Sequence, residues 1–337
     1  MNNMSGKQIL ACKLPGDLFS APENMENEFD RLAKKWHPDK PGGDVNVMAT
    51  INVLAAEAKK MISAGKWESS SKRFLTLNDG QLVRVSFLRD REFELGQSYI
   101  CNSVCVYIFK PEYAKAYEAP KFKFSGTRMK DEFTRYLPRI IDRYTTIGGE
   151  RIVVIDRPSD LVCLRDLLEH FSGNIPPRHV AWILSSLYNL CCFFRYNKLI
   201  HNSVNLDTYF VSPGLHGGTL LGGWWYHTSP GKKMTIVPGI TYSVMTTDAK
   251  KSKRAVYVTD LECVKMIGRT LLGSSSGSSL YKVDDLPKPM IQFLRSLSSD
   301  NAVDEYKEWT EVLSKSFGPK KFIEMGVDAK AIYNPSR

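Results

Sequence analysis

The chain has 337 residues, of which 43% are hydrophobic and 24% charged, and this composition is that of a folded globular protein. It excludes wholesale disorder, and the length is sufficient for two or three domains. The net charge is +10, and the excess lies beyond residue 70, because the first 70 residues contain nine basic and nine acidic side chains. No apolar run approaches the roughly 18 residues of a membrane span, so we expect no membrane partner.

The cysteine content points to a reducing compartment. The seven cysteines are odd in number and include no Cys-x-x-Cys pair, which fits neither a disulfide framework nor a zinc site. Residues 1–12 lack the basic-then-apolar plan of a signal peptide. We therefore expect a cytoplasmic protein without a metal or a cofactor.

The excess of basic residues raises the question of nucleic acid as a partner. A basic surface attracts polyanions, but these residues do not form one long run, and no known nucleic-acid-binding module is recognisable in the sequence. We therefore do not expect nucleic acid as a partner and interpret the excess as an ordinary basic surface.

Two helical patterns flank a loop near the amino terminus. Residues 25–36 repeat apolar side chains at spacings of three and four, and they place Arg31, Lys34 and Lys35 on a separate basic face. Residues 45–62 show a second apolar face, and the two helices would pack as an antiparallel hairpin. The expected apolar side chains are Met25, Phe29, Leu32, Ala33 and Trp36 in the first helix, and Met48, Ile51, Leu54, Ala55, Ala58 and Ile62 in the second.

The loop between these helices begins with His37-Pro38-Asp39 and continues through Lys40 to a Gly-Gly-Asp sequence. Proline disfavours helical geometry in the residue before it, so the tripeptide is expected on a turn. No second ligand stands at a useful spacing from His37, which argues against a metal site there.

Residues 14–65 resemble the J-domain family in this tripeptide, its Gly-Gly-Asp continuation and the basic helix before it. The resemblance implies that Arg31, Lys34, Lys35 and Lys40 meet an acidic face of a DnaK-type chaperone. It also implies that His37, Pro38 and Asp39 contact the machinery that triggers ATP hydrolysis. The first helix is abbreviated to about residues 15–19 and a fourth is not evident, a trimming similar to that of viral J-domains.

A stretch of small, polar and basic residues at 66–75 reads as a linker after a J-domain at 1–65. Residues 82–110 are rich in β-branched and aromatic side chains and predict strands. A helix at 127–145 and a strand at 151–155 follow, and from residue 161 the pattern is mainly helical. This order predicts an α+β fold whose second part has two lobes, a β-rich small lobe at 76–156 and an α-helical large lobe at 157–337.

Residues 155–211 resemble the middle of a protein kinase, from the hinge strand to the catalytic loop. His201 aligns with the family's catalytic-loop histidine. Ser203 stands in place of the aspartate that accepts the substrate proton, and Thr208 in place of a metal-binding asparagine. Gly222 and Gly223 lie where the metal-binding Asp-Phe-Gly is expected, without an acid. The resemblance therefore implies a kinase-like domain without catalytic activity.

Three further positions belong to this resemblance. It assigns the family's strand lysine to Lys110 and its helical partner to Glu132, although an apolar strand that ends in lysine is common. Asp260 resembles the aspartate that accepts hydrogen bonds from the catalytic-loop backbone. The aromatic sequence at 224–226 reads either as a buried plug in the nucleotide space or as an exposed contact patch, and we favour the plug.

The sequence thus predicts a J-domain co-chaperone that stimulates a DnaK-type ATPase, with a pseudokinase that binds an unknown client protein. The order of motifs is similar to that in proteins of large tailed bacteriophages, which implies the host cytoplasm. One alternative is an unorthodox kinase or nucleotidyl transferase on the same fold. Another is a purely structural interaction protein.

Overall fold

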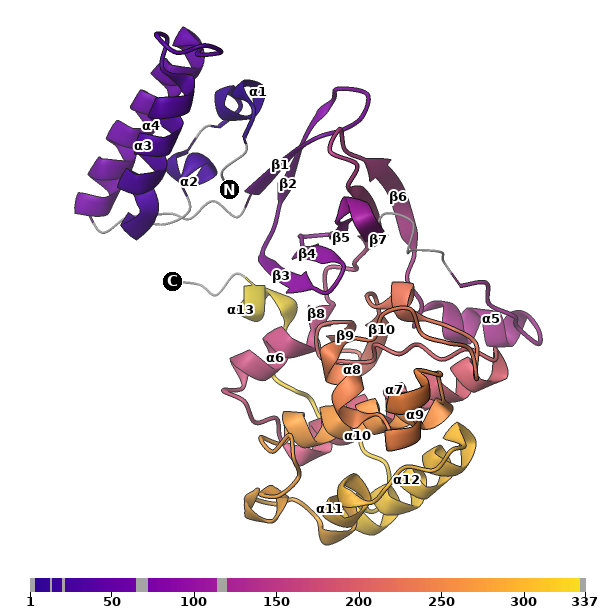
Figure 1. Cartoon of the computed structure of the whole chain (residues 1–337). Coiled ribbons are helices and arrows are strands. Elements are labelled where there is room, and N and C mark those ends of the chain that lie inside the picture. Colours follow the sequence, from indigo (N-terminus) through magenta and orange to yellow (C-terminus); the bar gives the residue numbers. More distant parts are fainter. Residues whose placement is uncertain (1–3, 13, 20–21, 65–71, 114–119, 334–337) are drawn as a thin grey trace. The chain divides into compact units, whose positions relative to one another are not determined.

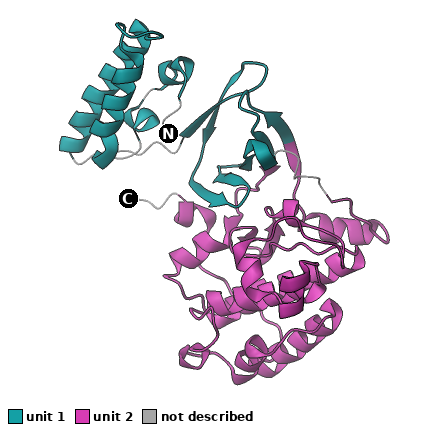
Figure 2. Cartoon of the chain, in the orientation of Figure 1, with its two compact units in different colours: residues 1–114, 142–154 teal, residues 115–141, 155–337 magenta. Residues whose placement is uncertain are grey.

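The structure is a computed structural model that describes residues 4–12, 14–19, 22–64, 72–113 and 120–333. It contains helices and β-sheets, as expected for an α+β protein (Figure 1). The chain divides into two compact units, which we describe separately (Figure 2). The first comprises residues 1–114 and 142–154, and the second comprises residues 115–141 and 155–337.

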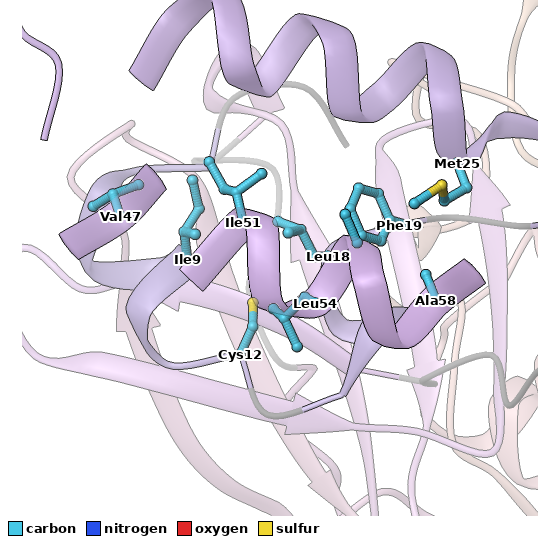
Figure 3. Close-up of a cluster of buried hydrophobic side chains, with 10 residues drawn as sticks. Ile9, Cys12, Leu18, Phe19, Met25, Val47, Ile51, Leu54 and Ala58 are labelled. Carbon is cyan, nitrogen blue, oxygen red and sulfur yellow. The ribbon is translucent and has the colours of Figure 1, made fainter. Parts of the chain in front are cut away.

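The first unit begins with short helices that surround a helical pair. Helices α3 (Met25–Trp36) and α4 (Val45–Ser63) occupy the ranges that the apolar spacing predicts, and α1 (Gly6–Leu10) and α2 (Pro15–Leu18) pack against α4. Figure 3 shows the apolar core that these helices share. Its buried members are Ile9, Cys12, Leu18, Phe19, Met25, Val47, Ile51, Leu54, Ala55 and Ala58.

Two details of this core differ from the prediction. Val47 is buried at 1% exposure although the spacing did not assign it to the core, and Ile62 is 36% exposed at the end of α4. The difference arises because α1 packs against the first turns of α4, so the buried face is shifted toward its amino-terminal end.

Seven strands, most of whose residues belong to the first unit, form two sheets. The hairpin of β1 (Lys72–Thr76) and β2 (Leu82–Ser86) is antiparallel. A five-stranded sheet has the order β3 (Arg89–Phe93), β4 (Gly96–Ile100), β5 (Val104–Phe109), β7 (Arg151–Asp156) and β6 (Ile140–Thr145).

The strands correct two predictions. Residues 72–75, which we assigned to the linker, belong to β1, and residues 65–71 lie outside the described residues. The helix expected at 127–145 ends at Thr134, and β6 follows it. Pro138 disfavours a helical conformation in Leu137, so the helix cannot continue toward residue 145. The β-branched and aromatic residues of Ile140–Thr145 then favour a strand.

The second unit is mainly helical, and it also holds a small sheet. The sheet has the order β10 (Gly217–Leu220), β9 (Tyr209–Ser212) and β8 (Val162–Cys163). The helices are α5 (Thr127–Thr134), α6 (Leu164–His170), α7 (Pro177–Tyr196), α8 (Gly239–Val244), α9 (Thr247–Ser252), α10 (Tyr257–Leu271), α11 (Lys288–Arg295), α12 (Ala302–Phe317) and α13 (Ala329–Tyr333).

The core of the second unit lies where α7 packs against α10 and α12. Tyr188, Phe293 and Trp309 form an aromatic cluster there, with ring centroids 5.1 to 5.9 Å apart. Helix α10, which packs against α7, carries Asp260 in its first turn. In the part of the chain that the structure describes, no helix is long and apolar enough to cross a membrane.

Candidate functional site

The first candidate site is the turn that follows α3. His37, Pro38, Asp39 and Lys40 are all exposed. The backbone N–H of Asp39 donates to Nδ1 of His37 at 3.3 Å, and the N–H of Lys40 donates to the carbonyl oxygen of His37 at 2.9 Å. The tripeptide is therefore held by its own hydrogen bonds while its side chains face solvent.

Glycine and aspartate complete this loop. A Cβ atom at Gly43 would lie 1.9 Å from the carbonyl oxygen of His37, so only glycine fits where the chain passes that residue. The N–H of Asp44 donates to the carbonyl oxygen of Trp36 at 3.3 Å. Its side chain then caps α4 by accepting from Asn46 and Val47 at 2.8 and 3.0 Å. The Gly-Gly-Asp sequence thus connects the tripeptide to both helices.

The basic side chains predicted beside this turn are exposed. Arg31, Lys34 and Lys35 are spaced by three and four residues on α3, so they share one side of the helix. Nζ of Lys35 lies 5.2 Å from the ring of Trp36, and Nε of Arg31 donates to the carbonyl oxygen of Asn27. Within the described residues, none of these three side chains forms an ion pair with a carboxylate, and Lys40 in the loop forms none either.

The second candidate site is the loop at 201–208, which Asp260 holds from the start of α10. Its carboxylate accepts from the backbone N–H of His201 at 2.7 Å and from that of Asn202 at 2.9 Å. Asn202 has a φ of 60°, and Thr241 donates to its carbonyl oxygen at 2.7 Å. The resemblance led us to expect this kind of backbone contact for Asp260, and the geometry contains it.

The side chains in the aligned catalytic positions are used within the loop. Ser203 is 1% exposed and Thr208 is 8% exposed. The hydroxyl of Thr208 donates to the carbonyl oxygen of Ser203 at 2.7 Å, and the amide of Asn205 donates to the Ser203 hydroxyl at 3.2 Å. These groups therefore stabilise the loop.

Asp207 is the one acidic residue between His201 and Tyr226. Arg165 binds its carboxylate through both Nε and Nη2, and the Nη2–Oδ2 distance is 2.7 Å. The pair is about one-third exposed on each side. Among the described residues, no group of three or more His, Cys, Asp and Glu side chains gathers in a metal-binding arrangement.

The segment aligned with the metal-binding motif is occupied by aromatic side chains. Trp224 is fully buried, its Nε1 donates to the carbonyl oxygen of Leu220 at 2.7 Å, and its ring lies edge-on to His201 at 4.7 Å. Trp225 and Tyr226 are 8% and 6% exposed. This burial argues against an exposed contact patch. That the rings fill a nucleotide space remains a prediction.

The two glycines before these aromatics have different environments. Gly222 is buried, and its N–H donates to the carbonyl oxygen of Thr208 at 3.1 Å. Gly223 has a φ of 79°, and a Cβ atom there would lie 2.7 Å from Cε1 of His201. The turn therefore depends on glycine at its second position.

Burial shifts the pKa values of both central titratable groups. It lowers the pKa of His201 to about 3, so the ring is neutral near pH 7. Burial also raises the pKa of Asp260 to about 6, against the opposing effect of the two N–H donors. Asp260 is therefore mostly ionised near pH 7, as two accepted hydrogen bonds require.

Lys110 and Glu132 lie in different units. Lys110 directly follows β5 in the first unit, and Glu132 lies in α5 in the second. Both side chains are exposed. Their pairing remains a prediction.

A cleft of about 1040 Å³ lies in the second unit. Its walls come from α7, β10, α12 and the segment after α12, and its lining includes Arg178, Trp182, His216, Phe317 and Lys320. None of the aligned positions lines it. Sequence reasoning missed this cleft because its walls come from segments far apart in the chain.

Of the comparisons with known proteins, the comparison with solved structures gave a match. No protein-family model matches the sequence, and no curated protein matches it. The structure is similar to a solved structure described as vaccinia related kinase 3, with a TM-score of 0.48 and 13% sequence identity. The match covers 76% of this chain and 95% of the other.

Proposed function

We propose that residues 1–65 form a J-domain that stimulates the ATPase of a DnaK-type chaperone. The observation that carries this proposal is the exposed His37-Pro38-Asp39 turn, which hydrogen bonds and the tight passage at Gly43 hold in one shape. A pre-ordered turn lowers the entropy cost of presenting a few specific groups to a partner.

The charges beside the turn support the same proposal. Arg31, Lys34, Lys35 and Lys40 are exposed and have no carboxylate partner among the described residues. Such charges increase the rate of encounter with an acidic surface. The basic face would therefore steer the chaperone toward the turn, and the turn would then make the specific contacts.

We further propose that the remainder is a catalytically inactive kinase-like domain that selects a client protein. Asp260 supports the loop backbone as the aligned kinase aspartate would, whereas Ser203 and Thr208 have hydroxyls in place of the base and the metal ligand. The one carboxylate in the loop, that of Asp207, is bound by Arg165. Phosphoryl transfer needs a positioned base and bound metal ions, and these side chains do not supply the usual groups for either.

The binding step can be tested by surface plasmon resonance with an immobilised bacterial DnaK-type chaperone in its ATP-bound state. The double variant Lys34→Glu/Lys35→Glu should bind at least tenfold more slowly than the wild type, because it reverses the steering charge. The matched control is Lys59→Glu/Lys60→Glu, which makes the same charge change on exposed residues of α4. Equal binding by both variants would contradict the proposed contact face.

The inactive assignment can be tested by thermal unfolding of the full chain with and without magnesium and ATP. A ligand that binds only the folded state raises its stability by mass action. We expect no change in the melting temperature beyond measurement error. An increase of several degrees would show that the chain binds the nucleotide and would reopen the alternative of an unorthodox kinase or nucleotidyl transferase.

A further inference from the structure

Six basic side chains from two separate parts of the chain lie together in the second unit. Residues 231–234 run antiparallel to residues 253–255, with Lys233 opposite Arg254. The N–H of Met234 donates to the carbonyl oxygen of Lys253 at 2.8 Å, and that of Ala255 donates to Lys232 at 2.9 Å. Helix α9 leads directly into the second segment. We call Lys232, Lys233, Lys250, Lys251, Lys253 and Arg254 the basic patch.

The basic patch has an unusually one-sided charge. Residues 231–254 contain these six cations and one acidic residue, Asp248, so their net charge of +5 is half that of the whole chain. Five of the six cations are exposed and Lys250 is half-buried. Among the described residues, none of the six forms an ion pair.

Part of this charge has an ordinary structural explanation, and part does not. Lys250 and Lys251 lie in the last turn of α9, where cations stabilise a helix. Arg254 lies opposite Lys233 in an isolated antiparallel bridge, and its Nη1 donates to the carbonyl oxygen of Gly231 at 2.6 Å. Among the described residues, the side chains of Lys232, Lys233, Lys251 and Lys253 form no hydrogen bond or ion pair, which leaves these four cations available for binding.

The patch rests on a fixed base. Met234 and Ala255, each next in sequence to one of the paired cations, are 4% and 0% exposed. They pack with Ile200, Met245 and Ala249 in one buried cluster. The core therefore fixes the backbone from which these cations project.

We propose that the basic patch binds the phosphate backbone of single-stranded nucleic acid. Lysine is depleted at protein–protein interfaces, whereas sequence-independent nucleic-acid binding rests on lysine and arginine contacts to phosphates. Tyr242 is 50% exposed, and Nζ of Lys250 lies 5.2 Å from its ring. An exposed aromatic ring beside cations is the arrangement on which unpaired bases stack. The sequence concealed this site, because the fold joins two short basic segments that are about 17 residues apart.

The test is fluorescence anisotropy of a labelled oligothymidylate with the full chain, at salt concentrations from about 50 to 200 mM. The variant Lys232→Gln/Lys233→Gln/Lys251→Gln/Lys253→Gln should lose at least tenfold in affinity. Its slope of log K against log salt should fall by about 3, because each phosphate contact of a single strand contributes roughly 0.7. The matched control is Lys307→Gln/Lys315→Gln/Lys320→Gln/Lys321→Gln, which removes four exposed lysines elsewhere in the unit and should bind like the wild type.

Each contrary result has a definite meaning. No binding by the wild type at about 50 mM salt, or equal losses in the variant and its control, would overturn the proposal. Displacement by polyglutamate as effective as by unlabelled oligothymidylate would assign the patch to acidic protein segments instead. Tyr242→Ala should weaken binding to the single strand more than to a duplex, and equal effects would overturn the role of base stacking. All variants retain His37, so chaperone stimulation is a separate readout.

Discussion

Gly223 passes so close to His201 that no side chain fits between them. A Cβ atom at Gly223 would lie 2.7 Å from Cε1 of the His201 ring and 2.9 Å from the side chain of Ser203. The glycine also has a φ of 79°, which other residues rarely adopt. The turn that carries the buried tryptophans and the loop at 201–208 therefore fix each other.

Gly223→Ala should lower the free energy of unfolding by about 3 kcal/mol, because it combines an unfavourable φ with a steric clash. Gly231→Ala is the matched control, since its φ is 76° and nothing lies within 4 Å of the added Cβ. That variant should lose only about 1 kcal/mol. Urea unfolding followed by tryptophan fluorescence measures both, and equal losses would show that the contact with His201 is not tight.

The buried ring of His201 predicts a dependence of stability on pH. Its pKa falls from an ordinary value of 6.5 to about 3 in the folded chain, so the unfolded state binds a proton more readily between these values. The free energy that this group contributes is complete above about pH 6.5 and is lost as the pH falls, at roughly 1.4 kcal/mol per pH unit. The contribution of Asp260 to stability changes with pH in the opposite direction. Because its pKa is raised in the folded chain, the folded state gains stability from this group as the pH falls from 6 toward 4.

The contribution of His201 to stability can be isolated with the variant His201→Asn. In the wild type, the backbone N–H of Ser203 donates to Nδ1 of His201, and the side-chain oxygen of asparagine can still accept this hydrogen bond. The difference in melting temperature between the wild type and this variant should narrow as the pH falls from 6.5 to 4.5. The exposed His170→Gln serves as the control for loss of a histidine outside the core. A constant difference for His201→Asn would contradict a neutral buried ring.

Gly43→Ala should displace the tripeptide turn, since its Cβ would lie 1.9 Å from the carbonyl oxygen of His37. We expect stimulation of the chaperone to fall at least fivefold while the helical content by circular dichroism is unchanged. Gly42→Ala is the control, because nothing lies within 4 Å of its added Cβ, although its φ of 82° costs about 1 kcal/mol. Full stimulation by Gly43→Ala would show that the shape of this loop does not matter.

A buried ion pair joins α10 to α12 in the second unit. Nζ of Lys265 lies 2.9 Å from Oε1 of Glu305, and the side chains are 0% and 1% exposed. Lys265→Met should lower the free energy of unfolding by about 3–5 kcal/mol, because it leaves a buried carboxylate without its partner. The double variant Lys265→Met/Glu305→Gln should recover a large part of this loss, since Gln can still accept from the N–H of Ser299. A double variant as unstable as the single one would contradict this explanation.

The sequence predicted those elements whose signal is local. The apolar spacing of α3 and α4 gave their ranges, and the contact between Asp260 and the loop backbone followed from an aligned motif. It did not predict the end of α5 at Thr134, because we extended one helical pattern past Pro138 into a strand.

The features that the sequence did not reveal depend on pairing between distant segments. Lys233 and Arg254 become neighbours only through an antiparallel bridge, and the cleft beside Trp182 is lined by helices and strands from several parts of the chain. The close approach of Gly223 to His201 is likewise invisible in a pattern of residue types. Motif alignment can identify which side chains are missing, but only the fold shows what occupies their surroundings.

The most direct test of the account is single-turnover ATP hydrolysis by a bacterial DnaK-type chaperone with the wild-type protein and with His37→Gln. The His37 side chain is 51% exposed and its ring accepts a hydrogen bond from the neighbouring Asp39 N–H, so we expect the variant to fold. We predict that the wild type accelerates hydrolysis about tenfold and that the variant does not, which is about 1.4 kcal/mol of activation free energy. No acceleration by the folded wild-type protein would contradict the J-domain assignment.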